Sequence, residues 1–239
     1  MEFTPDQHRL WVSNFFKGKV KELGFHLRGI VRCCDLSLAT FRIGHNQPEE
    51  VHTEVVFAFS SFSNAVQTLK DAGSTFLEPK ITWADLDQLR HGEFMRATRN
   101  AATHDGNPII SAWADGYFFI PAEIRRFDNK GNLIQIPAPE NDVRTFCLEF
   151  SHDFSAFLTS KLRPLERHEG SKLGISEVEQ GIKSPFVPEF ARELLEANRS
   201  QIEEALRGMR TYPAKEAIDE LSQINSFCTA QLAAISIAK

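Results

Sequence analysis

The sequence predicts an all-α protein, namely an antiparallel helical bundle with one inserted β-hairpin and a C-terminal helical extension. Large apolar residues recur at steps of three and four along most of the chain, which is the period of an amphipathic helix. Residues typical of helix caps and helix ends separate these runs. Most connections between the runs are short, and short connections favour antiparallel neighbours. With 239 residues, the chain is long enough for one large domain or two small ones.

The N-terminal third predicts three helices. Thr4 is a capping residue with Pro at the next position, and Gln7 completes the capping-box pattern, so a helix begins here. We expect Gly24 to end it. A second apolar run covers 27–41, and a third helix covers 48–71, opening at a proline and ending at an Asp-Ala-Gly-Ser segment.

The middle of the chain predicts a fourth helix and then a hairpin. Thr82 caps the helix, and the segment 105–108, Asp-Gly-Asn-Pro, ends it. Two apolar runs, 117–120 and 133–136, flank the turn-forming segment 128–132. We therefore expect these two runs to pair as the strands of the hairpin.

The last third predicts three further helices. Asn141 or Asp142 caps a fifth helix that continues to Leu158 and ends at Arg163-Pro164. Two more helices follow at 189–209 and 213–238. Their inward residues are expected to be Phe190, Leu194, Leu195, Ile202 and Leu206 in the first, and Ile218, Leu221, Ile224, Cys228, Leu232 and Ile235 in the second.

These elements suggest three parts. Residues 1–163 form the helical bundle, with the hairpin inserted at about 116–137. Residues 164–187, which mix Gly, Ser and Pro with charge, form a linker or an irregular crossing. Residues 188–239 form a C-terminal helical pair.

Composition limits the function classes. The net charge is −5, whereas a general nucleic-acid coat is normally basic, although one local site can differ in sign from the total. The four cysteines form no CxxC pair, and adjacent Cys33 and Cys34 are expected to be buried thiols. No signal peptide and no run of about 18 apolar residues occurs, so we expect a cytoplasmic protein with no membrane partner.

The fourth helix carries the most informative polar residues of the chain. At about 100° per residue, five of its side chains fall within an arc of roughly 140°. They are Arg96, Arg99, Asn100, Thr103 and His104. An imidazole exchanges a proton near neutral pH, and a guanidinium holds phosphate oxygens as a bidentate fork. Together with the amide, these groups suit metal-free phosphodiester cleavage through a 2′-hydroxyl.

The segment Arg99-Asn100-Ala101-Ala102-Thr103-His104 resembles the signature of the HEPN superfamily, in which Arg and a polar residue precede His by a short spacer. A second Arg-x4-His spacing, at Arg163 and His168, contains a proline and lies at a helix exit, so it lacks the helical context. HEPN proteins are helical bundles, and many are metal-independent ribonucleases in toxin–antitoxin, anti-phage and RNA-processing systems. The resemblance covers residues 1–162.

The resemblance implies an endoribonuclease acting on RNA as a homodimer, with one composite site formed by the motifs of two subunits. Arg99, Asn100 and His104 would be catalytic, and Arg96 and Thr103 would contact the substrate. It implies no metal and no cofactor. A possible partner is an antitoxin or a nucleotidyltransferase, although the subgroup with the latter carries Tyr where this chain has Gly106. The alternative within the same resemblance is a non-catalytic interaction or regulatory module.

A rival interpretation comes from two Glu-x-x-His pairs, Glu49 with His52 and Glu149 with His152. Ferritin-like di-metal proteins use two such pairs together with one further glutamate from each of two other helices. Glu22 or Glu93 would be the candidates here. This interpretation predicts that both pairs meet in the middle of the bundle.

Overall fold

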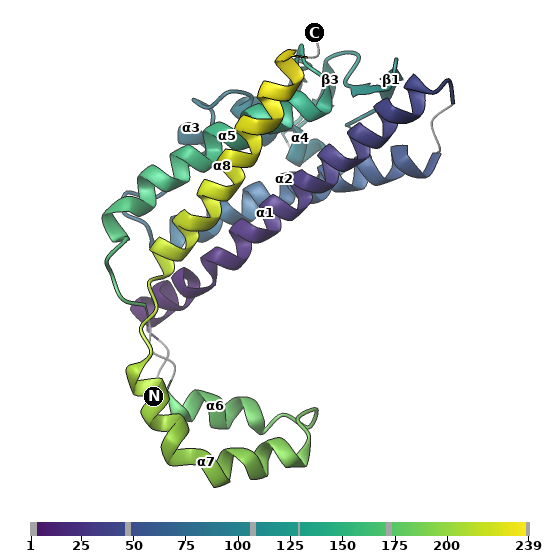
Figure 1. The fold of residues 1–239 in the computed structure, drawn as a ribbon. Helices are drawn as coiled ribbons and strands as arrows, with labels where there is room; N and C mark the ends of the chain where they lie inside the picture. The colour runs from purple at the N-terminus through teal and green to yellow at the C-terminus, as the bar shows by residue number, and fades with distance from the viewer. Residues whose placement is uncertain (1–3, 46–48, 106–108, 129, 171–173, 238–239) are drawn as a thin grey trace.

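A computed structural model describes residues 4–45, 49–105, 109–128, 130–170 and 174–237, with side chains described throughout except at 103–105, 176, 177 and 180. The fold is mostly helical, as expected. Four long helices lie side by side as a bundle (Figure 1). They are α1 (Pro5–Arg42), α2 (Glu49–Phe76), α5 (Val143–Leu162) and α8 (Pro213–Ile237).

Helix α5 is the central element of the core. Phe146, Phe150 and Phe154 are fully buried, and the first two lie edge-on to rings of α2. Phe146 contacts Phe59 of α2 with the ring centroids 5.8 Å apart, and Phe62 of α2 contacts Phe150 at 6.4 Å. Because both residue numbers increase together, α2 and α5 run in the same direction.

The expected antiparallel packing is correct for α1 with α2 and for α5 with α8, but α1 and α8 are parallel. Lys17 pairs with Glu216 at 3.2 Å, and one turn later Lys21 pairs with Glu220 at 3.4 Å. The reason is the connection 77–142, which carries the chain back along the whole bundle before α5 begins. Sequence periodicity does not reveal such a crossover.

Helix α1 does not end at Gly24, and α2 does not end at Gly73. A Cβ at Gly24 would lie 3.2 Å from Cγ1 of Ile224, and one at Gly73 would lie 2.8 Å from Cδ1 of Ile81. Both glycines therefore permit close packing by another segment, and that packing outweighs the cost of about 1 kcal/mol of a glycine inside a helix. The predicted start of α1 is confirmed, since Thr4 and Gln7 form the capping box.

The predicted fourth helix is two helices, α3 (Trp83–Leu86) and α4 (Gly92–Asp105). Thr82 caps α3 as expected. The chain then turns, with His91 in the left-handed region at φ 62°. A Cβ at Gly92 would lie only 1.8 Å from the carbonyl oxygen of Leu86, so this turn accepts only glycine at that position.

Two hairpins follow α4 rather than one. Strand β1 (Ala112–Ala114) pairs with β2 (Tyr117–Phe119), and β3 (Ile124–Phe127) pairs with β4 (Leu133–Ile136). The predicted pairing of 117–120 with 133–136 is therefore wrong. Asp115 and Gly116 both have positive φ, as a two-residue type I′ turn requires, so β2 folds back on its immediate neighbour.

The C-terminal part also differs from the prediction. A helix, α6 (Ile175–Ile182), lies within the segment expected to be a linker, and it packs against α7 (Glu189–Gly208). Helix α8 packs along α5 and α1, so α7 and α8 do not form the expected pair. Phe190 and Leu194, predicted to point inward, are 67% and 61% exposed, whereas the inward face of α8 is as predicted.

Candidate functional site

Helix α4 buries one face and leaves the other half-exposed. The buried face consists of Phe94, Met95, Thr98 and Ala101, which pack against the core. The Thr98 hydroxyl is fully buried and donates to the carbonyl oxygen of Phe94 at 2.8 Å. Arg96, Arg99 and Asn100 lie on the opposite face and are only half-buried, so the predicted polar arc does face outward at these positions.

The structure brings Arg99 and Asn100 into contact. Nη1 of Arg99 donates to Oδ1 of Asn100 at 3.1 Å. Nε of Arg99 is buried and has no hydrogen-bond partner among the described residues. A guanidinium has five N–H donors, so most of the donors of Arg99 have no hydrogen-bond partner among the described residues.

Arg99 also affects the electrostatics of α2. Burial pushes the pKa of the Asp71 carboxyl upward, but hydrogen bonds from Gln67 and Lys70, together with the charges of Lys70 and Arg99, hold that pKa below its usual range. No salt bridge joins Arg99 to a carboxylate among the described side chains. The charge of Arg99 therefore acts on Asp71, but no carboxylate among the described side chains neutralises it by direct contact.

Arg96 is placed differently. Its Nη1 lies 2.8 Å from Oδ2 of Asp87, in the turn between α3 and α4. The Asp87 side chain is only 13% exposed, and its second oxygen is buried with no partner in the described part of the chain. Arg96 therefore already has an internal counter-charge, and a substrate phosphate would compete with it.

Thr103 and His104 complete the predicted arc, but their side chains lie outside the described residues, as does Gly106. The backbone of α4 continues through Asp105, so the whole six-residue motif is helical as predicted. Positions 100 and 104 are consequently one helical turn apart.

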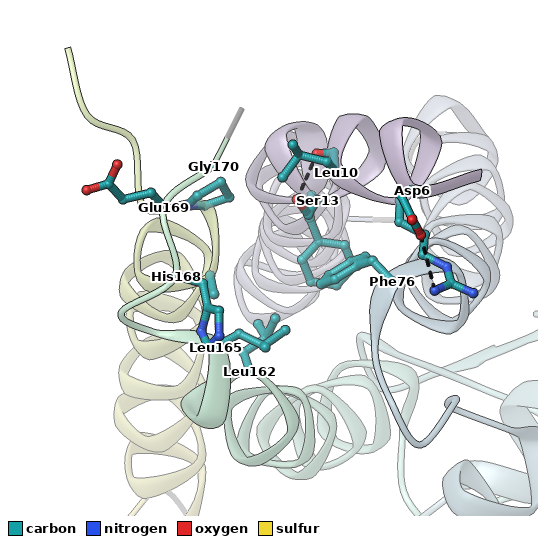
Figure 2. A pocket seen from close by; sticks show the side chains of 13 residues that line it. Asp6, Leu10, Ser13, Phe76, Leu162, Leu165, His168, Glu169 and Gly170 are labelled. Atoms are coloured by element: carbon teal, nitrogen blue, oxygen red, sulfur yellow. Dashed lines mark hydrogen bonds and ion pairs between the residues drawn. The ribbon is translucent and has the colours of Figure 1, made fainter. Parts of the chain in front are cut away.

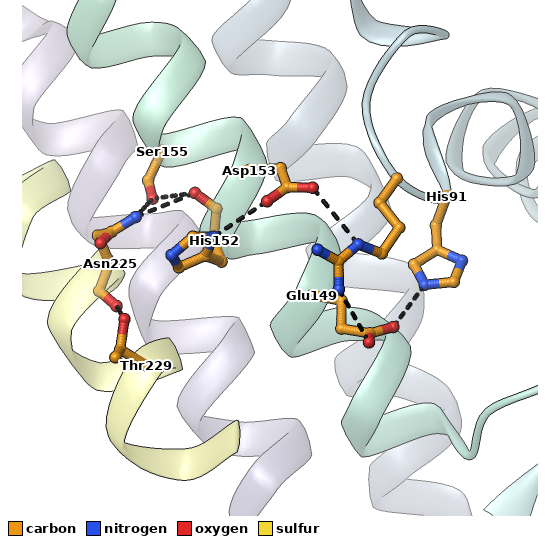
Figure 3. A network of polar contacts seen from close by, with 8 residues as sticks. His91, Glu149, His152, Asp153, Ser155, Asn225 and Thr229 are labelled. Atoms are coloured by element: carbon orange, nitrogen blue, oxygen red, sulfur yellow. Dashed lines mark hydrogen bonds and ion pairs between the residues drawn. The ribbon is translucent and has the colours of Figure 1, made fainter. Parts of the chain in front are cut away.

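A polar network holds the start of α4 in place, and sequence reasoning did not find it (Figure 3). The Glu149 carboxylate accepts from Nη1 of Arg90 at 3.0 Å and from Nδ2 of Asn141 at 3.0 Å, and it lies 2.8 Å from Nε2 of His91. Burial acts to raise the pKa of Glu149, but these three contacts keep it below its ordinary value. The network ties the turn before α4 to α5.

The two Glu-x-x-His pairs do not meet. His52 lies two turns before Phe59, whose ring faces Phe146, whereas Glu149 follows Phe146 by about one turn. The two pairs are therefore about 15 Å apart along the bundle at 1.5 Å per residue. Glu22 pairs with Lys19 at 2.8 Å, and Glu93 is exposed.

Across the ranges that the structure covers, no group of three or more His, Cys, Asp or Glu side chains gathers as a metal site. The four cysteines are all buried, as expected for Cys33 and Cys34. Burial raises the pKa of the Cys34 thiol well above its ordinary value. These thiols are therefore packing residues.

A separate cavity of about 270 Å³ lies between the start of α1 and the segment that follows α5 (Figure 2). Leu10, Phe16 and Phe76 form part of its apolar wall, and His168 lies at its edge. His168 belongs to the second Arg-x4-His spacing. None of its lining residues belongs to α4, so the cavity is not part of the candidate site.

None of the helices in the described ranges is both long enough and apolar enough to cross a membrane. No protein-family model, no curated protein and no solved structure matches this chain. The candidate site is therefore defined by the residues and contacts of α4 alone.

Proposed function

We propose that this chain is a metal-independent endoribonuclease of the HEPN type, with its site on the C-terminal half of α4. In this proposal Arg99 holds the scissile phosphate, Asn100 orients it, and His104 transfers a proton. Arg96 and Thr103 contact the substrate beside them. The observation that carries the proposal is the contact of Arg99 with Asn100 at 3.1 Å, with the buried Nε still unbonded among the described residues.

This contact suits phosphate binding because of what it leaves free. The amide oxygen of Asn100 fixes the direction of the guanidinium without neutralising its charge. The Nη groups of Arg99 have N–H donors left for phosphate oxygens, and the amide nitrogen of Asn100, which bonds to none of the described residues, can donate beside them. A guanidinium held in advance costs little reorganisation when charge develops on the phosphate in the transition state.

The proposed reaction needs no redox partner and no added group. The 2′-hydroxyl oxygen attacks phosphorus while the bond from phosphorus to the 5′-oxygen breaks. One imidazole accepts the proton from the 2′-oxygen, and a second donates a proton to the departing 5′-oxygen. The products are a 2′,3′-cyclic phosphate and a 5′-hydroxyl. The HEPN resemblance supplies the second imidazole from a second subunit, which is why a homodimer is part of the proposal.

The direct test uses an RNA oligonucleotide with a fluorophore and a quencher, in buffer containing a metal chelator. We expect cleavage that stops when the nucleotide 5′ of the cut lacks its 2′-hydroxyl. His104→Ala and Arg99→Ala should each lower the rate by about 100-fold or more. His168→Ala is the matched control, because it has the same spacing from an arginine and should keep the wild-type rate.

A cellular test addresses a toxin, anti-phage or stress role. Induction of the wild-type chain should arrest growth, and His104→Ala should relieve the arrest. Equal growth of the two strains together with equal RNA cleavage in vitro would remove the assignment of catalysis to α4.

The second candidate is a non-catalytic interaction module, with an antitoxin or nucleotidyltransferase among its possible partners. It is favoured by the exposed apolar residues outside the bundle, such as Phe186, which is 93% exposed. RNA binding without any cleavage product would support this candidate over the nuclease.

A further inference from the structure

The ion pair between Arg96 and Asp87 joins α4 to the turn that precedes it. Nη1 of Arg96 lies 2.8 Å from Oδ2 of Asp87, which is the length of a strong charge-assisted hydrogen bond. Asp87 is the residue at which α3 ends, and its backbone N–H donates to the carbonyl oxygen of Trp83. The counter-charge of Arg96 therefore comes from the element before α4 and not from α4 itself.

The Asp87 carboxylate has Arg96 as its one polar partner among the described residues. Its second oxygen, Oδ1, is buried and has no hydrogen-bond partner in that part of the chain. Carboxylates with a capping or bridging role use both oxygens here: Asp142 accepts from the backbone N–H and the hydroxyl of Thr145, and Glu149 has three partners. Because Asp87 has no such second contact, its polar role in the described structure is to hold Arg96.

Burial of Asp87 makes this ion pair hard to break. The Asp87 side chain is 13% exposed, whereas Glu203, which pairs with Arg207 on the surface of α7, is 40% exposed. An exposed carboxylate regains water when its partner leaves, but a largely buried one is left with its charge uncompensated. A phosphate that approaches Arg96 must therefore displace it from a carboxylate that water cannot satisfy.

Arg96 lies beside Arg99 on the outward side of α4. Two residues three apart on a helix have their Cβ atoms about 5–6 Å from each other, so both guanidiniums can reach one phosphate or two successive phosphates. The Arg96 side chain is 43% exposed, so solvent can reach it. What distinguishes the two arginines is the partner, which is the uncharged amide of Asn100 for Arg99 and a carboxylate for Arg96.

The backbone that carries Asp87 is held in place at the far end of the same turn. Arg90 and His91 both contact the Glu149 carboxylate of α5, at 3.0 and 2.8 Å (Figure 3). The next residue, Gly92, has no room for a Cβ against the carbonyl oxygen of Leu86. The turn thus has one closely defined path, and this path presents Asp87 to Arg96.

From the contact, its burial and its position beside Arg99, we infer that Asp87 sets the phosphate affinity of the α4 site by withholding Arg96 from the substrate. The inference rests on the proposed function, which places the phosphate at Arg99. Asp87 is a positioning residue, because it acts through Arg96 and does not touch the substrate. The substrate contact of Arg96 is then made only when Asp87 releases it. If the same ion pair instead pointed Arg96 toward the phosphate, removing the charge of Asp87 would have the opposite effect.

The test measures binding of a single-stranded RNA oligonucleotide with a 2′-O-methyl group on every nucleotide, which cannot be cleaved through its 2′-oxygens. Fluorescence anisotropy gives the dissociation constant at several salt concentrations. Asp87→Asn keeps the shape of the side chain and removes its charge. We expect the dissociation constant to fall by about 5-fold or more at low salt, and the slope of log affinity against log salt to steepen by about 1, as one added phosphate contact requires. Asp87→Ala should change both quantities in the same direction, whereas a merely structural role of Asp87 would not strengthen binding.

Two further variants show whether the gain comes from Arg96. Asp87→Asn/Arg96→Ala should lose the gain in affinity and in slope, and it leaves no buried charge unpaired, so it should keep the helical spectrum of wild type. Glu179→Gln is the matched control. Glu179 pairs with Arg199 at 2.7 Å between α6 and α7, which project away from the bundle (Figure 1), so this variant removes the same charge from an equally short ion pair elsewhere. Its dissociation constant should differ from that of wild type by less than about 2-fold.

Four results would overturn the inference: unchanged or weaker binding by both Asp87 variants, a gain that persists in Asp87→Asn/Arg96→Ala, an equal gain in Glu179→Gln, and no binding by any variant. The RNA-cleavage assay separates this inference from the proposed function. Cleavage that depends on His104, without stronger binding by Asp87→Asn, refutes the inference alone. Stronger binding by Asp87→Asn, without cleavage of unmodified RNA by the wild type, refutes the nuclease alone.

Discussion

Replacing Glu149 by alanine should destabilise the protein by about 3 kcal/mol. Its carboxylate is only 16% exposed and serves Arg90, His91 and Asn141 together. The two partners that are partly buried, His91 and Asn141, each lose an acceptor at a cost of about 1–3 kcal/mol. Arg90 is 52% exposed and regains water, so it adds little.

Urea denaturation followed by circular dichroism measures this effect. The midpoint of Glu149→Ala should fall by about 1 M relative to wild type, and Glu149→Gln, which keeps one acceptor oxygen, should lose less. Glu140→Ala is the control, because Glu140 lies nearby but is exposed. Its free energy of unfolding should differ from that of wild type by less than about 0.5 kcal/mol.

The difference in free energy of unfolding between wild type and Glu149→Ala should depend on pH in a definite direction. Because the folded-state pKa of Glu149 is below its ordinary value, the stabilisation is complete above the unfolded pKa of about 4.3 and is lost as the pH falls through the folded pKa. The gap between wild type and Glu149→Ala should therefore be full at about pH 6 and shrink under acid conditions. Two results would refute the reasoning. One is a stability difference below about 0.5 kcal/mol at pH 6, which is the size of an ordinary surface effect, and the other is a difference that does not change with acid.

Three further changes test other parts of the structure. Gly92→Ala places a methyl group 1.8 Å from the carbonyl oxygen of Leu86, so thermal unfolding should show a loss of at least about 2 kcal/mol. Gly18→Ala meets open space and should stabilise the protein by about 0.5–1 kcal/mol in urea titrations, whereas Gly24→Ala, on the same helix but tightly packed, should not. Arg99→Ala should lower the slope of RNA affinity against the logarithm of salt concentration by about 1 per subunit, as measured by fluorescence anisotropy.

Local signals predicted the helix starts well. The caps at Thr4, Thr82 and Asp142 follow from side chains that bond to backbone groups only three residues away, and all three are confirmed. The glycines at 24 and 73 misled because their role is tertiary. A glycine that ends a helix and one that admits a neighbouring side chain look the same in a single sequence.

The hairpin error has a different origin. An Asp-Gly turn signal stands at Asp115-Gly116, only two residues before Phe118, and it competes with the longer turn signal at 128–132. Two-residue turns close at a small entropy cost, so the local pairing forms rather than the more distant one.

The candidate site was predictable only in part. Helical geometry sufficed to place Arg99 and Asn100 on one outward arc, because both lie within a single regular helix. The pairing of Arg96 with Asp87 was not predictable. It spans a turn whose path depends on the positive φ of His91 and on the anchoring of that residue by Glu149.

The charges around α4 suggest why association would matter for a phosphate site here. Carboxylates neutralise Arg90 and Arg96. Among the described side chains, the direct partner of Arg99 is instead an uncharged amide. One uncompensated guanidinium on a chain of net charge −5 attracts a polyanion only weakly. Two such sites facing each other double the local positive charge without changing the fold.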